Sequence, residues 1–199
     1  MRESEFFIQA DQLFNDYVAL IGEHWNTHVP STPEWTVTQL VGHVADNNRE
    51  LIKALSGESQ IEEVGTDPET AWANSAERAE AVAATVSDVS EEVVFGGNSA
   101  TVGDTLSLQT ADRLLHAWDL ANAIGANTNL NDSLVQYVYD FVAPQADNAR
   151  AAGMFGAEVA VGPDATLQEK LLGVTGRDGG YEHHEPVDED EKAEEIHRS

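Results

Sequence analysis

Residues 104–125 read DTLSLQTADRLLHAWDLANAIG, and this stretch decides the fold. Asp104 is a favourable N-cap and Gly125 a favourable terminator, so the stretch predicts one long helix. Its apolar residues recur at helical spacing, which is typical of a helix packed against others. These residues are Leu106, Leu108, Leu114, Leu115, Trp118, Leu120, Ala121 and Ile124.

Three more long helices are predicted on the N-terminal side of this stretch. Apolar residues at spacings of three and four extend over residues 4–27, about 36–57 and about 66–86. Pro30 ends the first, Gly57 ends the second, and Asp67 and Pro68 suit the N-cap and first position of the third. Between the third and fourth helices, residues 88–103 hold short β-prone pieces around a GGNS turn, which predict a small hairpin or extended loop.

Shorter elements are predicted after residue 125. A helix starts near residues 131–132 and is kinked or ended by Pro144. Residues 157–163 have an extended pattern, and residues 164–173 predict a short helix. Together the pattern predicts an all-α domain, most simply an antiparallel four-helix bundle with a small hairpin or extended insertion and a short C-terminal helix.

The chain is strongly acidic, and the charge is spread over most of its length. Asp and Glu number 36 against 10 Lys and Arg, a formal net charge of −26. Residues 181–199 carry eight acids and little that is apolar after Tyr181, so we expect a disordered acidic tail over residues 179–199 and a folded domain over residues 1–178. So few cations exclude binding to nucleic acid or to an anionic membrane surface.

The cysteine count and the N-terminus bear on compartment and chemistry. The chain has no cysteine, which agrees with a reducing compartment and removes disulfides, thiolate metal ligands and cysteine nucleophiles. No apolar run is long enough to span a membrane, and the N-terminus lacks the pattern of a signal peptide. We therefore expect a cytoplasmic protein, in which any metal is held by histidine and carboxylate.

Polar residues on apolar helix faces are the candidates for chemistry. Asp112 and His116 stand four residues apart and share one face of the helix over residues 104–125. A buried carboxylate needs a partner, and Arg113, Arg49 or a metal ion could each supply one. His43 lies among apolar residues of the second helix, where a core histidine and a ligand are both open interpretations.

A second histidine pair, His24 and His28, has the same spacing. The pair falls at the end of the first predicted helix, where a charged histidine favours the helix dipole, so we interpret it as helix capping. His183 and His184 lie in the predicted tail and are expected to be exposed to solvent.

Three segments together resemble a known family. STPEWTVTQLVGHV at residues 31–44, TADRLLHAWDLANAIG at residues 110–125 and FGAEVAVGPDATLQEKLLGVTGRD at residues 155–178 resemble actinobacterial metal-binding proteins related to the N-terminal domain of mycothiol-dependent maleylpyruvate isomerase. This family is part of the DinB/YfiT-like superfamily. The resemblance implies a DinB/YfiT-like four-helix bundle that holds a divalent ion on His43, Asp112 and His116, with Asp119 outside the ligand set.

The resemblance also implies a function. Two histidines and one carboxylate leave a coordination position open, as in a catalytic site, and zinc is the expected ion, with nickel or iron as alternatives. Such relatives use a low-molecular-weight thiol, mycothiol, as cosubstrate, which implies a thiol-dependent isomerase or S-transferase acting on a small electrophile. A non-catalytic metal-binding stress or interaction module is the alternative.

The acidity and the length of the chain bear on substrate and partners. The full isomerase resembles a bundle followed by a second α/β domain, whereas a short element and the acidic tail follow the bundle here. Maleylpyruvate is a dianion, and the net charge of −26 favours a neutral or cationic substrate. The expected partners are a small-molecule thiol and an electrophile, with neither nucleic acid nor membrane, and a homodimer remains open.

Overall fold

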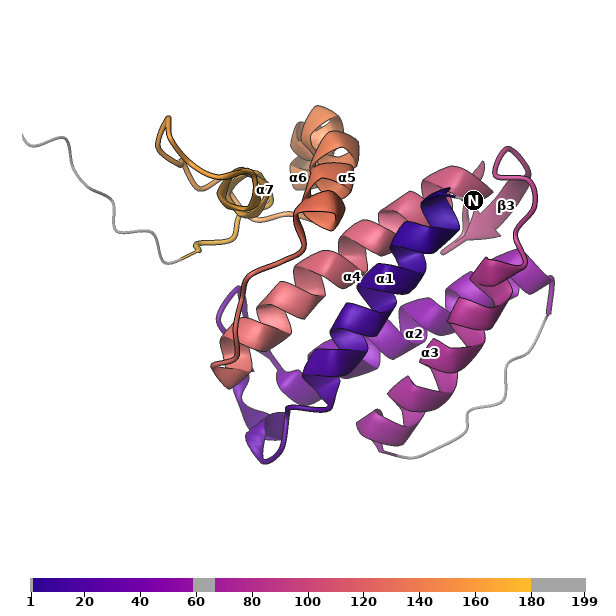
Figure 1. The fold of residues 1–199 in the computed structure, drawn as a ribbon, viewed down its shortest axis with the longest axis horizontal. Coiled ribbons are helices and arrows are strands. Elements are labelled where there is room, and N and C mark those ends of the chain that lie inside the picture. Colours follow the sequence, from indigo (N-terminus) through magenta and orange to yellow (C-terminus); the bar gives the residue numbers. More distant parts are fainter. Residues whose placement is uncertain (1, 59–66, 180–199) are drawn as a thin grey trace, which may run out of the picture.

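Four long helices form a bundle in the computed structural model, which describes residues 2–58 and 67–179 (Figure 1). They are α1 (Arg2–Val18), α2 (Val37–Ser56), α3 (Pro68–Ala84) and α4 (Val102–Ile124). Each helix packs mainly against two others: α1 and α2 both contact α3 and α4. The predicted four-helix bundle is confirmed, and the hydrophobic core lies along its axis.

The helix directions differ from a simple antiparallel arrangement. Helices α1 and α4 run parallel, since Phe7 shares a core cluster with Leu106 near the helix starts and the Tyr17 hydroxyl donates to the Asn127 carbonyl beyond the end of α4 (2.6 Å). Helices α2 and α3 also run parallel (Figure 1). The fully antiparallel expectation was wrong because it assumed short turns between successive helices, whereas residues 57–67 separate α2 from α3.

The first helix is shorter than predicted. It ends at Val18, and Gly22 adopts a left-handed backbone (φ 53°) that a continuing helix does not allow. A short 3-10 helix, η1 (His24–Asn26), and an antiparallel pair of strands, β1 (His28–Val29) and β2 (Thr32–Thr36), follow. The apolar residues that suggested a longer helix remain in the core: Ile21 is buried, although it lies outside any helix.

The second hairpin confirms the prediction for residues 88–103. Strands β3 (Glu92–Phe95) and β4 (Asn98–Thr101) pair antiparallel, from Glu92 with Thr101 to Phe95 with Asn98. The turn residues Gly96 and Gly97 both have positive φ, as a two-residue hairpin turn requires. The hairpin lies at the end of the bundle where α4 begins (Figure 1).

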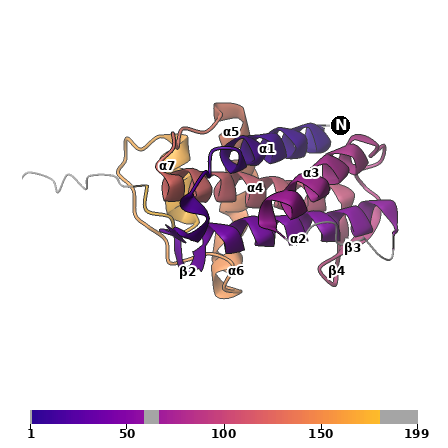
Figure 2. The same ribbon diagram turned by 90° about the horizontal axis from the view of Figure 1, so that it is seen from below.

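The C-terminal elements lie beside α4. Helix α5 (Asp132–Val142) packs on α4 and ends before Pro144, which lies in a 3-10 helix, η2 (Ala143–Gln145). Helix α6 (Ala146–Ala151) follows, and α7 (Leu167–Val174) packs on α5. Figure 2 shows α5 and α6 running across the long axis of the bundle.

Residues 157–163 contain no regular strand. The predicted acidic tail lies outside the described residues except for Gly179. Among the described helices, none is long and apolar enough to cross a membrane.

Candidate metal centre

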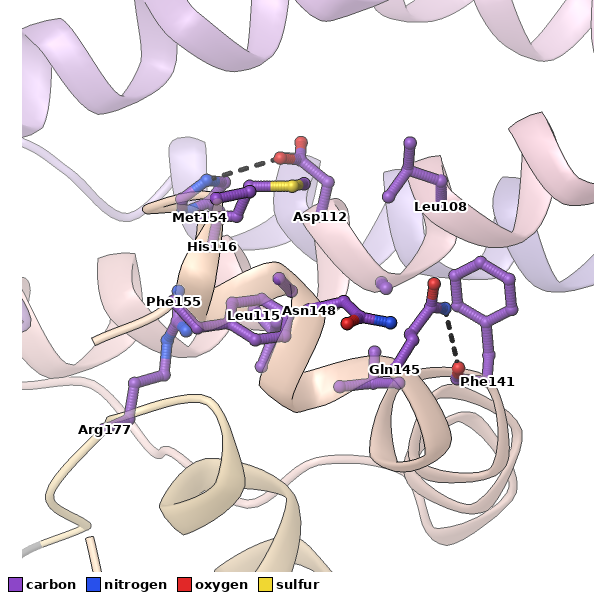
Figure 3. Close-up of a pocket in the computed structure, with 14 residues that line it drawn as sticks. Leu108, Asp112, Leu115, His116, Phe141, Gln145, Asn148, Met154, Phe155 and Arg177 are labelled. Atoms are coloured by element: carbon purple, nitrogen blue, oxygen red, sulfur yellow. Dashed lines mark hydrogen bonds and ion pairs between the residues drawn. The ribbon is translucent and has the colours of Figure 1, made fainter. Parts of the chain in front are cut away.

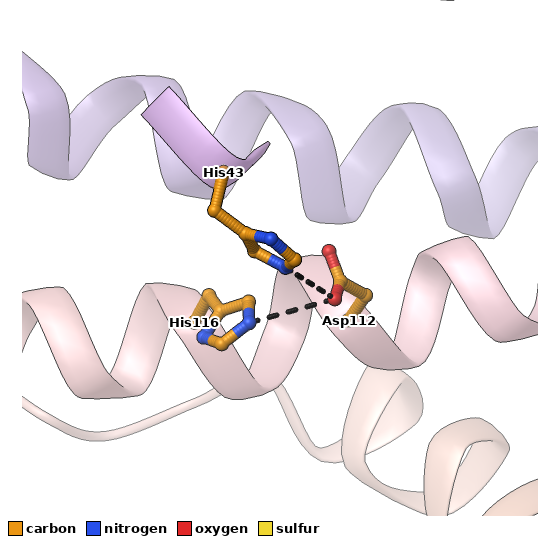
Figure 4. A group of neighbouring side chains, drawn as sticks. All are labelled: His43, Asp112 and His116. Carbon is orange, nitrogen blue, oxygen red and sulfur yellow. Dashed lines mark ion pairs between the residues drawn. The ribbon is translucent and has the colours of Figure 1, made fainter. Parts of the chain in front are cut away.

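Two bundle helices bring the predicted ligands together. His43 projects from the second turn of α2, and Asp112 and His116 project from successive turns of α4 toward it (Figure 4). Oδ1 of Asp112 lies 3.5 Å from Nε2 of His43 and 3.5 Å from Nε2 of His116. One ligand atom from each residue lies within 4.8 Å of the others, so the three could contact a single ion.

The Asp112 carboxylate is oriented by donors on its other oxygen. Oδ2 accepts hydrogen bonds from Nη1 of Arg113 (2.7 Å) and from Nδ2 of Asn47 (3.2 Å), while Oδ1 faces the two imidazoles. Burial alone would raise the pKa of Asp112. The charge and hydrogen bond of His116, the hydrogen bond of His43 and the Arg113 guanidinium outweigh it and hold this pKa well below its usual value.

The His116 ring is oriented by a buried carboxylate. Nδ1 of His116 lies 2.9 Å from Oδ2 of Asp119, and in the neutral ring a proton assigned to Nδ1 leaves Nε2 free to face the site. Burial would lower the pKa of His116, but Asp112 and then Asp119 raise it to about 9. Asp119 is itself held by Nε and Nη2 of Arg177 (2.9 and 2.7 Å) and by the Ser31 hydroxyl (2.6 Å).

Arg113 connects the site to the core of the bundle. Its side chain is fully buried, and Nε donates to Asp11 of α1 (2.9 Å) while Nη2 donates to the Asn48 amide oxygen of α2. With the bond to Asp112, the three nitrogens of one guanidinium contact three different helices. Because a fixed fork of donors has little freedom, this contact fixes where α4 lies relative to α1 and α2.

The site remains accessible. The side chains of His43, Asp112 and His116 are 35%, 19% and 12% exposed. The Trp35 ring lies next to both imidazoles, tilted against each, with centroid distances of 5.0 Å to His43 and 6.2 Å to His116. Asp112 and His116 also line a cavity of about 330 Å³ between α4, α5 and α6 (Figure 3).

The donor set fits a divalent ion. Two imidazole nitrogens and one carboxylate oxygen are ligands suited to zinc, nickel or ferrous iron. Asp119 supplies the outer carboxylate that usually accompanies a ligating histidine. Three such donors with remaining exposure would leave room for a further ligand on a bound ion.

The rival histidines lie apart from this cluster. His24 lies in η1 and His28 in β1, and both side chains are exposed. Nδ1 of His28 contacts the Pro33 carbonyl (2.8 Å). Our interpretation as helix capping was wrong, because α1 ends at Val18 before reaching either residue.

Of the two proposed arginine partners for Asp112, one is confirmed. Arg113 contacts it, whereas Arg49 pairs with Asp46 on the surface of α2. Two contributing residues were not identified from the sequence. Asn47 follows His43 by one helical turn, so its spacing could have indicated that it lies near the site. For Arg177, the sequence offered only the Gly-Arg pair in the family-like segment at residues 155–178.

Comparison with known proteins shows the family. The model of the mycothiol maleylpyruvate isomerase N-terminal domain matches residues 8–121, which is more than half of the chain. No curated protein gives a significant match. Two crystal structures of the mycothiol-dependent maleylpyruvate isomerase, one of a mutant, match at 17% identity with TM-scores of 0.66 for the mutant and 0.65 for the other.

These structural matches extend beyond the bundle. The match to the mutant covers 90% of this chain and 90% of the mutant's chain, and the other match covers 89% of each. The similarity in fold therefore includes most of the C-terminal part of the isomerase, which we expected this chain to lack. The likeness in structure establishes the fold, and the match over residues 8–121 establishes the family. The chain therefore belongs to the mycothiol maleylpyruvate isomerase N-terminal domain family.

Proposed function

We propose that His43, Asp112 and His116 hold one divalent ion, zinc foremost, and that the protein is a thiol-dependent isomerase or S-transferase acting on a small electrophile. The observation that carries this proposal is the convergence of two Nε2 atoms on Oδ1 of Asp112 at the wall of a cavity. Family membership supports the thiol dependence, because the family is described by a mycothiol-dependent reaction.

The roles of the chain's own residues follow from their contacts. Arg113 and Asn47 hold Oδ2 of Asp112, so Oδ1 is presented to the ion. Asp119 keeps the Nδ1 proton of His116 and directs Nε2 to the ion. A divalent ion bound here supplies a Lewis acid that lowers the pKa of a thiol ligand and so makes a thiolate nucleophile available at neutral pH.

The nucleophilic sulfur comes from outside the chain under this proposal. The sequence contains no cysteine, so a protein thiol is not available for the reaction. The isomerase of the two matching crystal structures is mycothiol-dependent, which supports mycothiol as the external thiol. The cavity beside Asp112 and His116 gives an electrophile a place next to such a thiolate.

Cobalt-substituted protein provides the test. Mycothiol is titrated into the cobalt-loaded chain, and we expect a thiolate-to-cobalt charge-transfer band in the near ultraviolet that saturates at one thiol per ion. A double variant, His24→Ala with His28→Ala, should retain the band, and His116→Ala should lose it. Stoichiometric cobalt without such a band would contradict thiol ligation and favour the non-catalytic metal-binding module.

A further inference from the structure

A layer of polar side chains crosses the core of the bundle next to the metal cluster. It has one member from each long helix: Asp11 of α1, Asn48 of α2, Ser75 of α3 and Arg113 of α4. All four side chains are buried. The layer reaches the cluster through Arg113, whose Nη1 donates to Oδ2 of Asp112 (2.7 Å). One candidate ligand is therefore bonded directly to a group that lies inside the bundle.

Arg113 is the centre of this layer. Its Nε donates to Oδ1 of Asp11 (2.9 Å), and its Nη2 donates to the amide oxygen of Asn48. Nδ2 of Asn48 donates in turn to the Ser75 hydroxyl (3.4 Å), which donates to the Trp72 carbonyl (2.9 Å). The guanidinium is thus held by two groups of the core while its third nitrogen reaches the ligand.

Asp11 is costly for the fold. Its Oδ2 is buried and accepts no hydrogen bond among the described residues. A buried carboxylate with an unpartnered oxygen lowers stability, and a buried ion pair is weak evidence for a stabilising role. Burial raises the pKa of Asp11 to about 6, because the charge of Arg113 offsets only part of the cost of desolvation. Stability alone therefore does not explain why a carboxylate rather than an amide occupies this position.

Charge balance gives Asp11 a role at the metal cluster. The Asp112 carboxylate would be shared between two cations, Arg113 on Oδ2 and a divalent ion on Oδ1. These cations repel each other across one carboxylate. The negative charge of Asp11 offsets that of Arg113, so the guanidinium can hold Oδ2 without weakening the attraction of Asp112 for the ion.

We propose that Asp11 is a positioning residue for the metal centre, and that it acts through Arg113. Its charge neutralises the guanidinium that orients Asp112, and this raises the affinity of the cluster for a divalent ion. The inference rests on the proposed function, because it requires an ion at the cluster. It adds that a helix without a ligand, α1, helps to set the affinity for that ion.

Asp11→Asn tests the charge with a small change in shape. The amide oxygen can still accept from Nε of Arg113, but the negative charge is lost. Groups that contact a ligand typically alter metal affinity about 10–100-fold, and Asp11 lies one residue further from the ion, so we expect zinc affinity to fall at least about fivefold. Competition with a chromophoric chelator measures it above the pKa of Asp11, on full chains whose fold is checked by circular dichroism. Asp11→Ser, which also removes the charge, serves if Asp11→Asn does not fold.

Moving the charge within the layer separates the effect of charge from that of shape. Asn48→Asp places a carboxylate where the native amide oxygen accepts from Nη2 of the same guanidinium. Combined with Asp11→Asn, it should return zinc affinity to within about threefold of the wild type. Asp16→Asn is the matched control, because Asp16 is exposed on the same helix and its loss changes the net charge equally.

The outcomes distinguish this inference from the proposed function. If the wild type binds zinc and a folded Asp11→Asn binds it equally well, the inference is overturned and the metal centre stands. Equal losses in Asp11→Asn and Asp16→Asn would also overturn it, because net charge would then explain the loss. A folded double variant that recovers no affinity would show that the shape of Asp11 matters and its charge does not. A wild type that binds no zinc would overturn both proposals.

Discussion

Asp119→Asn removes the negative charge that lies between the His116 ring and the Arg177 guanidinium. Asp119 is fully buried and the Arg177 side chain is 10% exposed, so the substitution leaves a nearly buried cation without its partner. Breaking such a pair costs about 3–5 kcal/mol of the free energy of unfolding. His116 also loses the carboxylate that orients it, which should weaken zinc binding about 10–100-fold.

A second substitution separates these two effects. Arg177→Met combined with Asp119→Asn removes the unpaired cation, so we expect the double variant to regain a substantial part of the lost stability. Its zinc affinity should stay low, because Nδ1 of His116 still lacks a carboxylate partner. Urea unfolding of the metal-free proteins measures stability, and competition with a chromophoric chelator measures zinc affinity.

The reasoning fails on either of two results. Wild-type zinc affinity in Asp119→Asn would mean that Asp119 does not orient the ligand. Recovery of zinc affinity together with stability in the double variant would mean that the single variant bound zinc poorly because its fold was damaged. Ser31→Ala, which removes a hydroxyl donor to the same carboxylate, is a milder comparison and should lower zinc affinity less.

Arg113→Met should lower the free energy of unfolding by about 3–5 kcal/mol, because Asp11 and Asp112 lose their buried partner. Arg49→Met, which breaks only the surface pair with Asp46, should lower it by under about 1 kcal/mol. Urea unfolding of the two variants measures the difference. Stability of the metal-free protein should also depend on pH. The pKa of His116 is raised to about 9 from 6.5, so its contribution is fully present below pH 6.5 and is lost as pH rises through about 9. Stability that increased over this range would contradict the assignment. Zinc binding at neutral pH should release about one proton, because His116 is protonated in the metal-free state; calorimetry in buffers of different ionisation enthalpy measures it.

The helices of the bundle were predictable from caps and periodicity, although α4 begins at Val102 with Thr101 as its N-cap, so the prediction of Asp104 as the cap was wrong by three residues. Thr36 caps α2 in a capping box and Gly125 ends α4 with a left-handed conformation, and both boundaries follow from residue type. The end of α1 was not predictable in this way. Ile21 and Trp25 continue the apolar spacing, but Ile21 is buried and Trp25 is half-buried through tertiary contacts of a segment outside any α-helix.

The candidate ligands were predictable as polar residues on apolar helix faces, and the family resemblance selected among them. The spacing of Asp112 and His116 needed only local helix geometry, whereas their approach to His43 depends on how α2 and α4 pack. Arg177 could not be placed by any local rule, since 58 residues separate it from Asp119. Long-range ion pairs of this kind become visible in the folded chain.

The zinc content of the purified protein tests the metal centre most directly. After equilibrium dialysis against zinc, we predict one ion per chain for the wild type and for variants lacking His24 and His28 or His183 and His184. We predict no stoichiometric zinc for His43→Ala, Asp112→Ala and His116→Ala, each checked for its fold by circular dichroism. A wild-type protein without zinc, or folded ligand variants that retain one zinc per chain, would contradict the assignment of His43, Asp112 and His116 as the metal site.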